Sequence, residues 1–183
     1  MNVMVLVEPS LPHLDAYAAA LRQGWSPSNV RDVTGEQLAA IAADPAGFVA
    51  QFTAVGRPVT LGDGRVVPRL PGPVRWMWDG AFCGAISLRF VPGTEDLPAH
   101  VLGHIGYAVV PWKRRRGYAT EALRQILPFA IAAGLRHVDL TCDSDNRPSQ
   151  KVIEANGGAL VSSAQDDARP GHERLLYRIV LAG

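Results

Sequence analysis

The stretch Gly103–Leu123, GHIGYAVVPWKRRRGYATEAL, decides the fold of this chain. Its first part, IGYAVV, has the two-residue period of a strand, and Pro111 ends that strand because proline has no amide hydrogen to give a sheet. After a short basic turn, Gly117 supplies backbone freedom, and apolar residues then recur at helical spacing. The stretch therefore predicts a strand to about Val110, a turn, and a helix from about Gly117.

The basic turn is suited to an anionic ligand. A helix that begins in a glycine-containing turn presents unpaired amide hydrogens and the positive end of its dipole, so it can hold a phosphate or pyrophosphate. Lys113 and three arginines add mobile positive charge. At the carboxyl end of a strand in an open sheet, such a turn is a site for an anionic cofactor. The sequence contains neither the P-loop signature nor the glycine signature of dinucleotide folds.

Composition places the chain among ordinary globular domains. Its 183 residues, 48% of them apolar, suffice for one domain with a full core. The formal net charge of +1 excludes the basic field that makes nonspecific nucleic-acid binding strong. There is no run of about 18 apolar residues to cross a bilayer, and no signal-peptide pattern. We therefore expect a cytoplasmic protein with no nucleic-acid or membrane partner.

The two cysteines carry no recognisable chemistry. Cys83 and Cys142 lie in apolar, strand-like runs and have no metal-ligand spacing. They are interpreted as reduced core residues, and no metal site is expected.

The first third of the chain predicts an edge strand within 1–8 and helices between residues 10 and 52. Thr34 and Gln37 have the spacing of a capping box. Residues 56–73 are rich in glycine and proline, which predicts a long loop or an irregular hairpin.

The rest of the chain predicts mainly strands. Two strands flank Asp79-Gly80, a strong hairpin signal. A short strand over 138–142 follows the motif helix, so the three elements form a βαβ unit with locally parallel pairing. A helix capped by Asn146 ends near 156–158, and strands over 159–163 and 174–181 close the chain.

Two segments resemble a known family. Arg114, Gly117 and Ala119, read as Arg-x-x-Gly-x-Ala after Val-Val-Pro, resemble the acyl-CoA signature of the GNAT superfamily of N-acetyltransferases. Asn146 and Ser149, with the helix that follows them to Gly157, are similar to the second conserved region of that family. The resemblance covers residues 102–158 well and is only architectural at the amino terminus.

The resemblance implies a fold and a cosubstrate. The expected fold is a mixed α/β GNAT-like domain spanning 1–183, with a mostly antiparallel sheet of six to seven strands, a βαβ cofactor-binding unit and helices on both faces. Residues 102–158 would form the acyl-CoA core, while the helices of 10–52 and the segment 56–73 would shape the acceptor site. The residues expected to bind acetyl-CoA are Val109, Val110, Arg114, Arg115, Arg116, Gly117, Tyr118, Ala119, Thr120, Asn146 and Ser149.

The catalytic proton carriers are less evident. Ile153 stands where many relatives carry a tyrosine that protonates the departing thiolate, and isoleucine cannot donate a proton. An alkylammonium acceptor has a pKa near 10.4, so a base must remove one proton before attack. The candidate bases near the motif strand are His104, Glu95 and Asp96, with His100 and Asp143 as alternatives.

The sequence thus predicts an acetyl-CoA-dependent N-acetyltransferase that acts by direct transfer on a primary amine of a small molecule or peptide. A non-catalytic acyl-CoA-binding sensor or interaction module of the same fold is the alternative, which Ile153 keeps open. The acceptor and a homodimeric state stay open.

Overall fold

The computed structural model describes residues 3–28, 32–61, 64–166 and 170–182 of the chain. A four-stranded antiparallel sheet has the order β1-β4-β5-β6, and a three-stranded antiparallel sheet has the order β7-β9-β8. The bounds of the first sheet are β1 Val5–Val7, β4 Val74–Trp78, β5 Phe82–Leu88 and β6 Ile105–Val109. Those of the second are β7 His137–Asp143, β8 Ala159–Gln165 and β9 Glu173–Val180.

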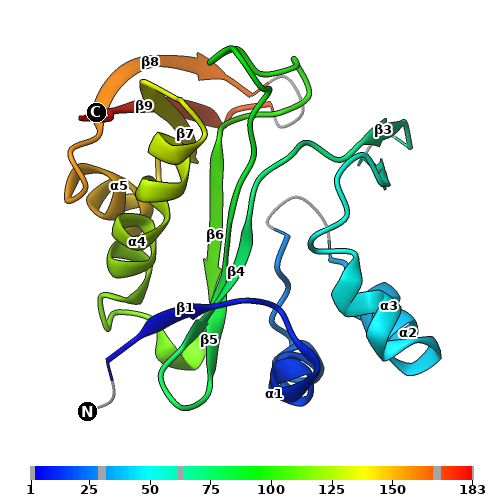
Figure 1. Ribbon diagram of the computed structural model, residues 1–183. Coiled ribbons are helices and arrows are strands. Elements are labelled where there is room, and N and C mark those ends of the chain that lie inside the picture. The colour runs from blue at the N-terminus through cyan, green and yellow to red at the C-terminus, as the bar shows by residue number, and fades with distance from the viewer. Residues whose placement is uncertain (1–2, 29–31, 62–63, 167–169, 183) are drawn as a thin grey trace.

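Helices lie on both sides of the first sheet (Figure 1). One side carries α1 Leu11–Arg22, α2 Thr34–Ala43 and α3 Pro45–Ala50, and the other carries α4 Tyr118–Ala132 and α5 Arg147–Glu154. A 3-10 turn, η1 Pro111–Lys113, precedes α4. The predicted mixed α/β architecture, with mostly antiparallel strands and helices on two faces, is confirmed.

Each side of the sheet has its own core. Tyr17 of α1 stacks on Trp76 of β4 with ring centroids 4.7 Å apart, and Phe48 of α3 joins them. On the other side, Leu123 and Ile126 of α4 belong to a core that also contains buried residues of both sheets. Each fully buried large apolar side chain contributes roughly 1.5–3 kcal/mol to folding. Burial on both faces explains why β5 reads as a nearly continuous apolar run.

Several local predictions are confirmed. β1 is the edge strand predicted within residues 1–8, of which residues 1 and 2 lie outside the described residues. Gly80 adopts φ +101° in the hairpin between β4 and β5, the left-handed region that favours glycine. The segment 56–73 is an irregular hairpin of β2 Pro58–Thr60 and β3 Val66–Pro68, with residues 62 and 63 outside the described part.

Two predictions are wrong. The expected capping box does not form, because Val33 occupies the N-cap of α2 and Gln37 instead accepts a hydrogen bond from the Tyr17 hydroxyl at 2.5 Å. The expected parallel ladder between β6 and β7 is also absent from the described residues, since the two strands belong to separate sheets.

The contact between the two sheets explains the missing ladder. The His104 amide donates to the Asp139 carbonyl at 2.7 Å, but the Asp139 amide donates to Nδ1 of the His104 ring at 2.9 Å. The imidazole thus takes the place of the next backbone partner, and the pairing ends after one bond. Beyond this point no described strand pairs with the edge of β6 that faces away from β5.

Candidate functional site

The turn before α4 forms a cradle of backbone amides. Gly117 is the N-cap of α4 at φ +78°, and no side chain in the described part of the chain caps that helix. The first amides of an α-helix have no carbonyl four residues earlier, so those of Tyr118, Ala119 and Thr120 are available to an anion. A Cβ built on Gly117 would meet nothing within 4 Å, so the space over the turn is open.

Three arginines surround this cradle with exposed side chains: Arg114, Arg115 and Arg116. Arg115 has φ +59°, an uncommon conformation for a residue other than glycine, and it lets the turn close within a few residues. Arg114 donates from Nε to the Val109 carbonyl at 3.3 Å, which ties the turn to the end of β6. Cations on this rim would neutralise a pyrophosphate held by the amides.

The hairpin between β4 and β5 holds the turn from the side. Asp79 accepts hydrogen bonds from Lys113 Nζ at 2.5 Å and from the Tyr118 hydroxyl at 2.6 Å. Desolvation raises the pKa of Asp79, but the hydrogen bonds from Lys113 and Tyr118 outweigh it and lower this pKa to about 2. A cavity of about 710 Å³ opens here, with Gly117 and Arg116 also in its wall. Sequence reasoning assigned Asp79 only to a hairpin, because the contact joins residues about 35 positions apart.

The open edge of β6 presents a second row of backbone groups. The Val110 amide donates to the Cys83 carbonyl at 2.9 Å, so Val110 is paired within the β5–β6 ladder. Hydrogen-bonded and non-hydrogen-bonded pairs alternate along an antiparallel ladder, and Gly84 pairs with Val109 in register. The amides of Val109 and Tyr107 therefore face away from β5. Of the two amides predicted to grip the cosubstrate, the structure places that of Val109 at the open edge and that of Val110 in the sheet.

Two hydroxyl groups meet across this edge. The Tyr107 hydroxyl lies 2.7 Å from Oγ of Ser149, which stands in the first turn of α5. Burial raises the pKa of Tyr107 to about 12, although the hydrogen bond with Ser149 opposes this shift. Asn146 caps α5 by accepting from the Ser149 amide at 3.2 Å, as predicted. The second motif therefore faces the middle of β6.

The two motifs lie close together in the structure. Asn156, just after α5, donates from Nδ2 to the Thr120 carbonyl in the first turn of α4 at 3.2 Å. Ile153, on the same helix, is 1% exposed and belongs to the core shared by both sheets. The position of the usual tyrosine is thus filled by a packed apolar side chain.

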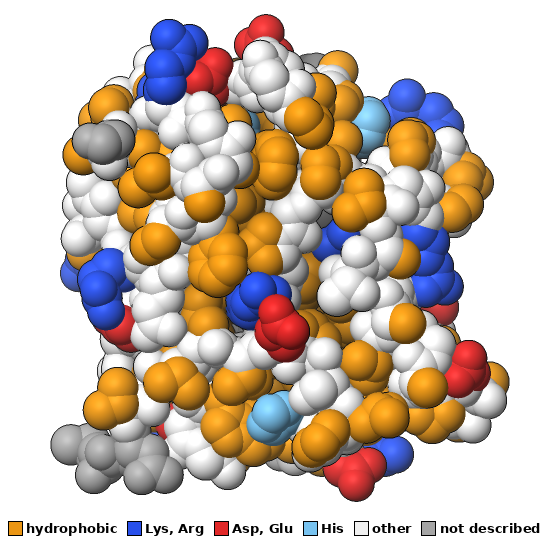
Figure 2. Space-filling model, in the orientation of Figure 1, with side chains coloured by type: hydrophobic (Ala, Val, Ile, Leu, Met, Phe, Trp, Pro, Cys, Tyr) orange, Lys and Arg blue, Asp and Glu red, His pale blue; other side chains and the backbone are white. Residues whose placement is uncertain are grey.

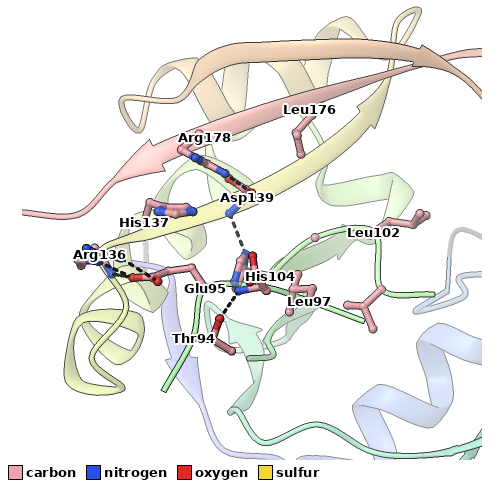
Figure 3. Close-up of a pocket in the computed structure, with 13 residues that line it drawn as sticks. Thr94, Glu95, Leu97, Leu102, His104, Arg136, His137, Asp139, Leu176 and Arg178 are labelled. Atoms are coloured by element: carbon pink, nitrogen blue, oxygen red, sulfur yellow. Dashed lines mark hydrogen bonds and ion pairs between the residues drawn. The ribbon is translucent and has the colours of Figure 1, made fainter. Parts of the chain in front are cut away.

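The three predicted bases line one cavity, of about 570 Å³, at the beginning of β6 (Figure 3). Glu95 forms an ion pair with Arg136, with Oε1 2.8 Å from Nε, and hydrogen bonds from Arg136 lower its pKa to about 2. Asp96 is exposed, and its carboxylate enters no ion pair between described residues. The structure therefore brings Glu95, Asp96 and His104 together, at the opposite end of β6 from the basic turn.

The environment of His104 determines which nitrogen carries the proton. The ring is 1% exposed, and burial lowers its pKa, which favours the neutral form. Since Nδ1 accepts the amide hydrogen of Asp139, the neutral ring carries its proton on Nε2. Nε2 has no hydrogen-bond partner among the described residues. In this tautomer the Nε2 hydrogen is not used by any described residue, and the ring's one lone pair, on Nδ1, already accepts the Asp139 amide hydrogen.

The cysteines are free and buried, as expected. Burial raises the pKa of both thiols, Cys83 and Cys142, to about 11, so neither is an activated nucleophile. In the part of the chain that the structure describes, no cluster of three or more His, Cys, Asp or Glu side chains could hold a metal ion. Nor does any helix among these residues have the length and hydropathy to cross a membrane.

Comparison with family models identifies the fold. Residues 30–159 match the model described as Acetyltransferase (GNAT) domain, which covers more than half of the chain. This chain belongs to the GNAT family of acetyltransferases. The prediction of an acetyl-CoA-dependent acetyltransferase is thereby confirmed at the level of the family. No curated protein sequence matches the GNAT chain.

Solved structures show the same GNAT fold. The self-immunity acetyltransferase MccE, solved with acetyl-CoA and AMP, is 13% identical over 99% of this chain and 94% of its own, with a TM-score of 0.61. An acetyltransferase from Salmonella typhimurium that modifies the N-terminal serine of ribosomal protein L7/L12 is 12% identical over 100% and 97%, with a TM-score of 0.63. RimL in complex with coenzyme A is 13% identical over 99% and 96%, with a TM-score of 0.65. At these identities the likeness concerns the fold alone.

Proposed function

We propose that this GNAT protein transfers the acetyl group of acetyl-CoA directly to a primary amine of a small molecule or peptide. The observation that carries the proposal is the uncapped, glycine-led start of α4 beside the open edge of β6. An anion cradle and a row of free backbone groups are what a cosubstrate with a pyrophosphate and an amide-containing arm requires. Acetyl-CoA supplies the acetyl group as an activated thioester.

Binding falls to residues of both motifs. The amides of the α4 start would hold the pyrophosphate, and the amides of Val109 and Tyr107 would align the arm along β6. The full set that we assign to cosubstrate binding is Val109, Arg114, Arg115, Arg116, Gly117, Tyr118, Ala119, Thr120, Asn146 and Ser149. Fixing the reacting groups in this way removes much of the entropic barrier to an intermolecular transfer.

The hydroxyl pair of Tyr107 and Ser149 provides a proton at the open edge. Oγ of Ser149 lies 2.7 Å from the Tyr107 hydroxyl, so a proton that leaves Ser149 can be replaced from Tyr107, which regains one from water at this half-buried position. The pair can therefore protonate the departing thiolate, which the buried side chain of Ile153 cannot do. We assign to Ser149 the proton transfer to the sulfur of the leaving group.

Asp96 is the base that we propose on the acceptor side. Among the three predicted bases, Glu95 is held by Arg136, and the Nδ1 lone pair of His104 already accepts the Asp139 amide hydrogen. The Asp96 carboxylate is exposed and can take a proton from the acceptor amine through water. Helices α1, α2 and α3 and the β2–β3 hairpin would shape the acceptor entrance, since α4 and α5 occupy the cosubstrate side.

The second candidate is a module that binds acyl-CoA without turnover. The packed Ile153 favours this candidate, since the position where many relatives carry a proton-donating tyrosine is here part of the core. Release of free thiol in the presence of an amine panel separates the two functions, because a sensor binds acetyl-CoA but releases none.

Calorimetry with acetyl-CoA tests the location of the site. Gly117→Asp places a carboxylate over the cradle and should abolish binding. Gly134→Asp is the matched control, since Gly134 ends α4 at φ +84° with no atom near its Cβ, so it carries the same backbone strain away from the site. Tight binding by Gly117→Asp, or equal losses in both variants, would refute the assignment of the turn.

A further inference from the structure

A second group of arginines lies on the sheet face opposite α4 and α5. Ile86 and Leu88 of β5 point into the core with α4, so Arg89, next along the strand direction, points to the other face. Its Nε donates to the Gly103 carbonyl at 2.7 Å. A Cβ built on Gly106 would lie 3.1 Å from Nη2 of Arg89, so the guanidinium rests on the β6 backbone at that glycine.

Arg69 belongs to a segment that packs against the same strand. Its Nη2 donates to the Gly72 carbonyl at 3.0 Å. Gly72 is packed on the strand that carries Arg89, since a Cβ there would lie 2.1 Å from the Leu88 carbonyl oxygen and 3.1 Å from Cα of Arg89. The segment is fixed there because the Phe90 amide donates to the Pro71 carbonyl at 3.1 Å. Each of the two guanidinium groups is thus tied to a backbone carbonyl of a segment that packs at the end of β5.

Neither arginine has a counter-ion in the described part of the chain. Other arginines do have one: Arg75 pairs with Glu8, Arg124 with Glu121, Arg136 with Glu95, Arg174 with Asp166 and Arg178 with Asp139. Burial lowers the pKa of both Arg69 and Arg89, with no acidic neighbour to oppose it. A desolvated cation without a partner is unfavourable, so a counter-ion from a ligand would offset that cost.

The position of the pair relates it to the reaction. Gly106, under the Arg89 guanidinium, directly precedes Tyr107, whose amide faces the open edge of β6. This is the face that carries α1, α2 and α3, the helices that we propose to shape the acceptor entrance. Both arginines are partly exposed, so a solute can reach them. The face shown in Figure 2 has Lys and Arg side chains spread among acidic and apolar ones, and so resembles no broad nucleic-acid surface.

We propose that Arg89 and Arg69 bind an oxyanion, a carboxylate or a phosphate, carried by the acceptor amine. This rests on the proposed function and deepens it by naming the acceptor class. Guanidinium groups suit this task because they stay charged when desolvated and present paired donors that match the oxygens of a carboxylate or phosphate. The acceptor would then be an amino acid, an acidic peptide terminus or an aminoalkyl phosphate, rather than a simple polyamine.

The test uses pairs of amines that differ only in charge: amino acids against their methyl esters, and aminoalkyl phosphates against the parent amino alcohols. The wild-type chain should prefer one anionic series by about 10- to 100-fold in kcat/KM. Arg89→Gln and Arg69→Gln should remove this preference and leave turnover of the neutral partners unchanged. The control is Arg75→Gln, since Arg75 lies on the other face, over Phe129 and beside Glu8, and should keep the preference.

Each outcome decides the proposal. Preference for the amino-acid series identifies a carboxylate, and preference for the phosphate series identifies a phosphate. Equal turnover of charged and neutral amines by the wild type would overturn it, as would a loss in Arg89→Gln that affects both series equally.

If no amine is acetylated, the proposed function fails, and the oxyanion site is then read by calorimetry. N-acetylglycine and inorganic phosphate are titrated into the acetyl-CoA-loaded wild type and Arg89→Gln. Binding of either probe that is lost in Arg89→Gln supports the site without turnover. The absence of binding by the wild type refutes it.

Discussion

Replacing Asp79 with asparagine should weaken both the fold and the binding of acetyl-CoA. The Asp79 carboxylate, 12% exposed, holds Lys113, 14% exposed, and the Tyr118 hydroxyl on the two sides of the basic turn. Asparagine can keep hydrogen bonds to both neighbours but leaves the Lys113 ammonium without a negatively charged partner. The turn would then lose the contact that sets its position on the hairpin.

The magnitude follows from the pKa of Asp79. A fall from 3.8 to about 2 corresponds to about 2 kcal/mol of stability at neutral pH. For a domain of this size, that amount lowers Tm by about 4–8 °C. Because the pKa is depressed in the folded state, the contribution is complete above the unfolded pKa of 3.8 and is lost as the pH falls through about 2. We expect acetyl-CoA affinity to fall about tenfold, the equivalent of one charge-assisted hydrogen bond.

Urea unfolding at several pH values between 2.5 and 7, with calorimetry of acetyl-CoA at pH 7, measures both effects. Asp15→Asn serves as the control, since Asp15 is an exposed residue of α1 and enters no ion pair between described residues. Equal stability of wild type and Asp79→Asn at pH 7 would refute the energetic reasoning. A loss of stability with unchanged affinity would show that the Asp79 contacts do not position the turn for the cosubstrate.

Three further substitutions address the mechanism. Ser149→Ala should lower kcat by about 10²-fold, a larger factor than its loss of acetyl-CoA affinity, because it removes a proton donor as well as a cosubstrate contact. Steady-state kinetics and calorimetry measure the two effects, and an unchanged kcat would exclude the role as proton donor. Asp96→Asn should lower kcat while the variant still binds acetyl-CoA, because the acceptor amine loses its base. Full activity in the thiol-release assay would rule out Asp96 as the base. Ile153→Tyr should destabilise the fold by about 1–3 kcal/mol, because Ile153 is 1% exposed and a larger ring overpacks the core. Urea unfolding measures this loss. A stable, more active variant would show instead that the position tolerates a proton donor.

The strand, turn and helix of the first motif could be predicted because their causes are local. Period-two alternation, Pro111 and Gly117 lie within about a dozen residues of one another, and each restricts the backbone directly. The cap of α5 by Asn146 is local for the same reason. The absence of a parallel ladder between β6 and β7 could not be predicted from local patterns. It depends on the His104 side chain, whose ring accepts the Asp139 amide hydrogen in place of a backbone carbonyl.

The sequence by itself determined the family and the elements that form the cosubstrate site, since both depend on short-range patterns. Only the tertiary structure decided which groups point into that site. The β5–β6 register turned the Val110 amide into the sheet and the Val109 amide toward the open edge. Pairing between distant segments also brought Asp79 to the turn, Ser149 to Tyr107 and Arg69 to the end of β5. Such contacts depend on the three-dimensional path of the chain, which no local pattern of residues encodes.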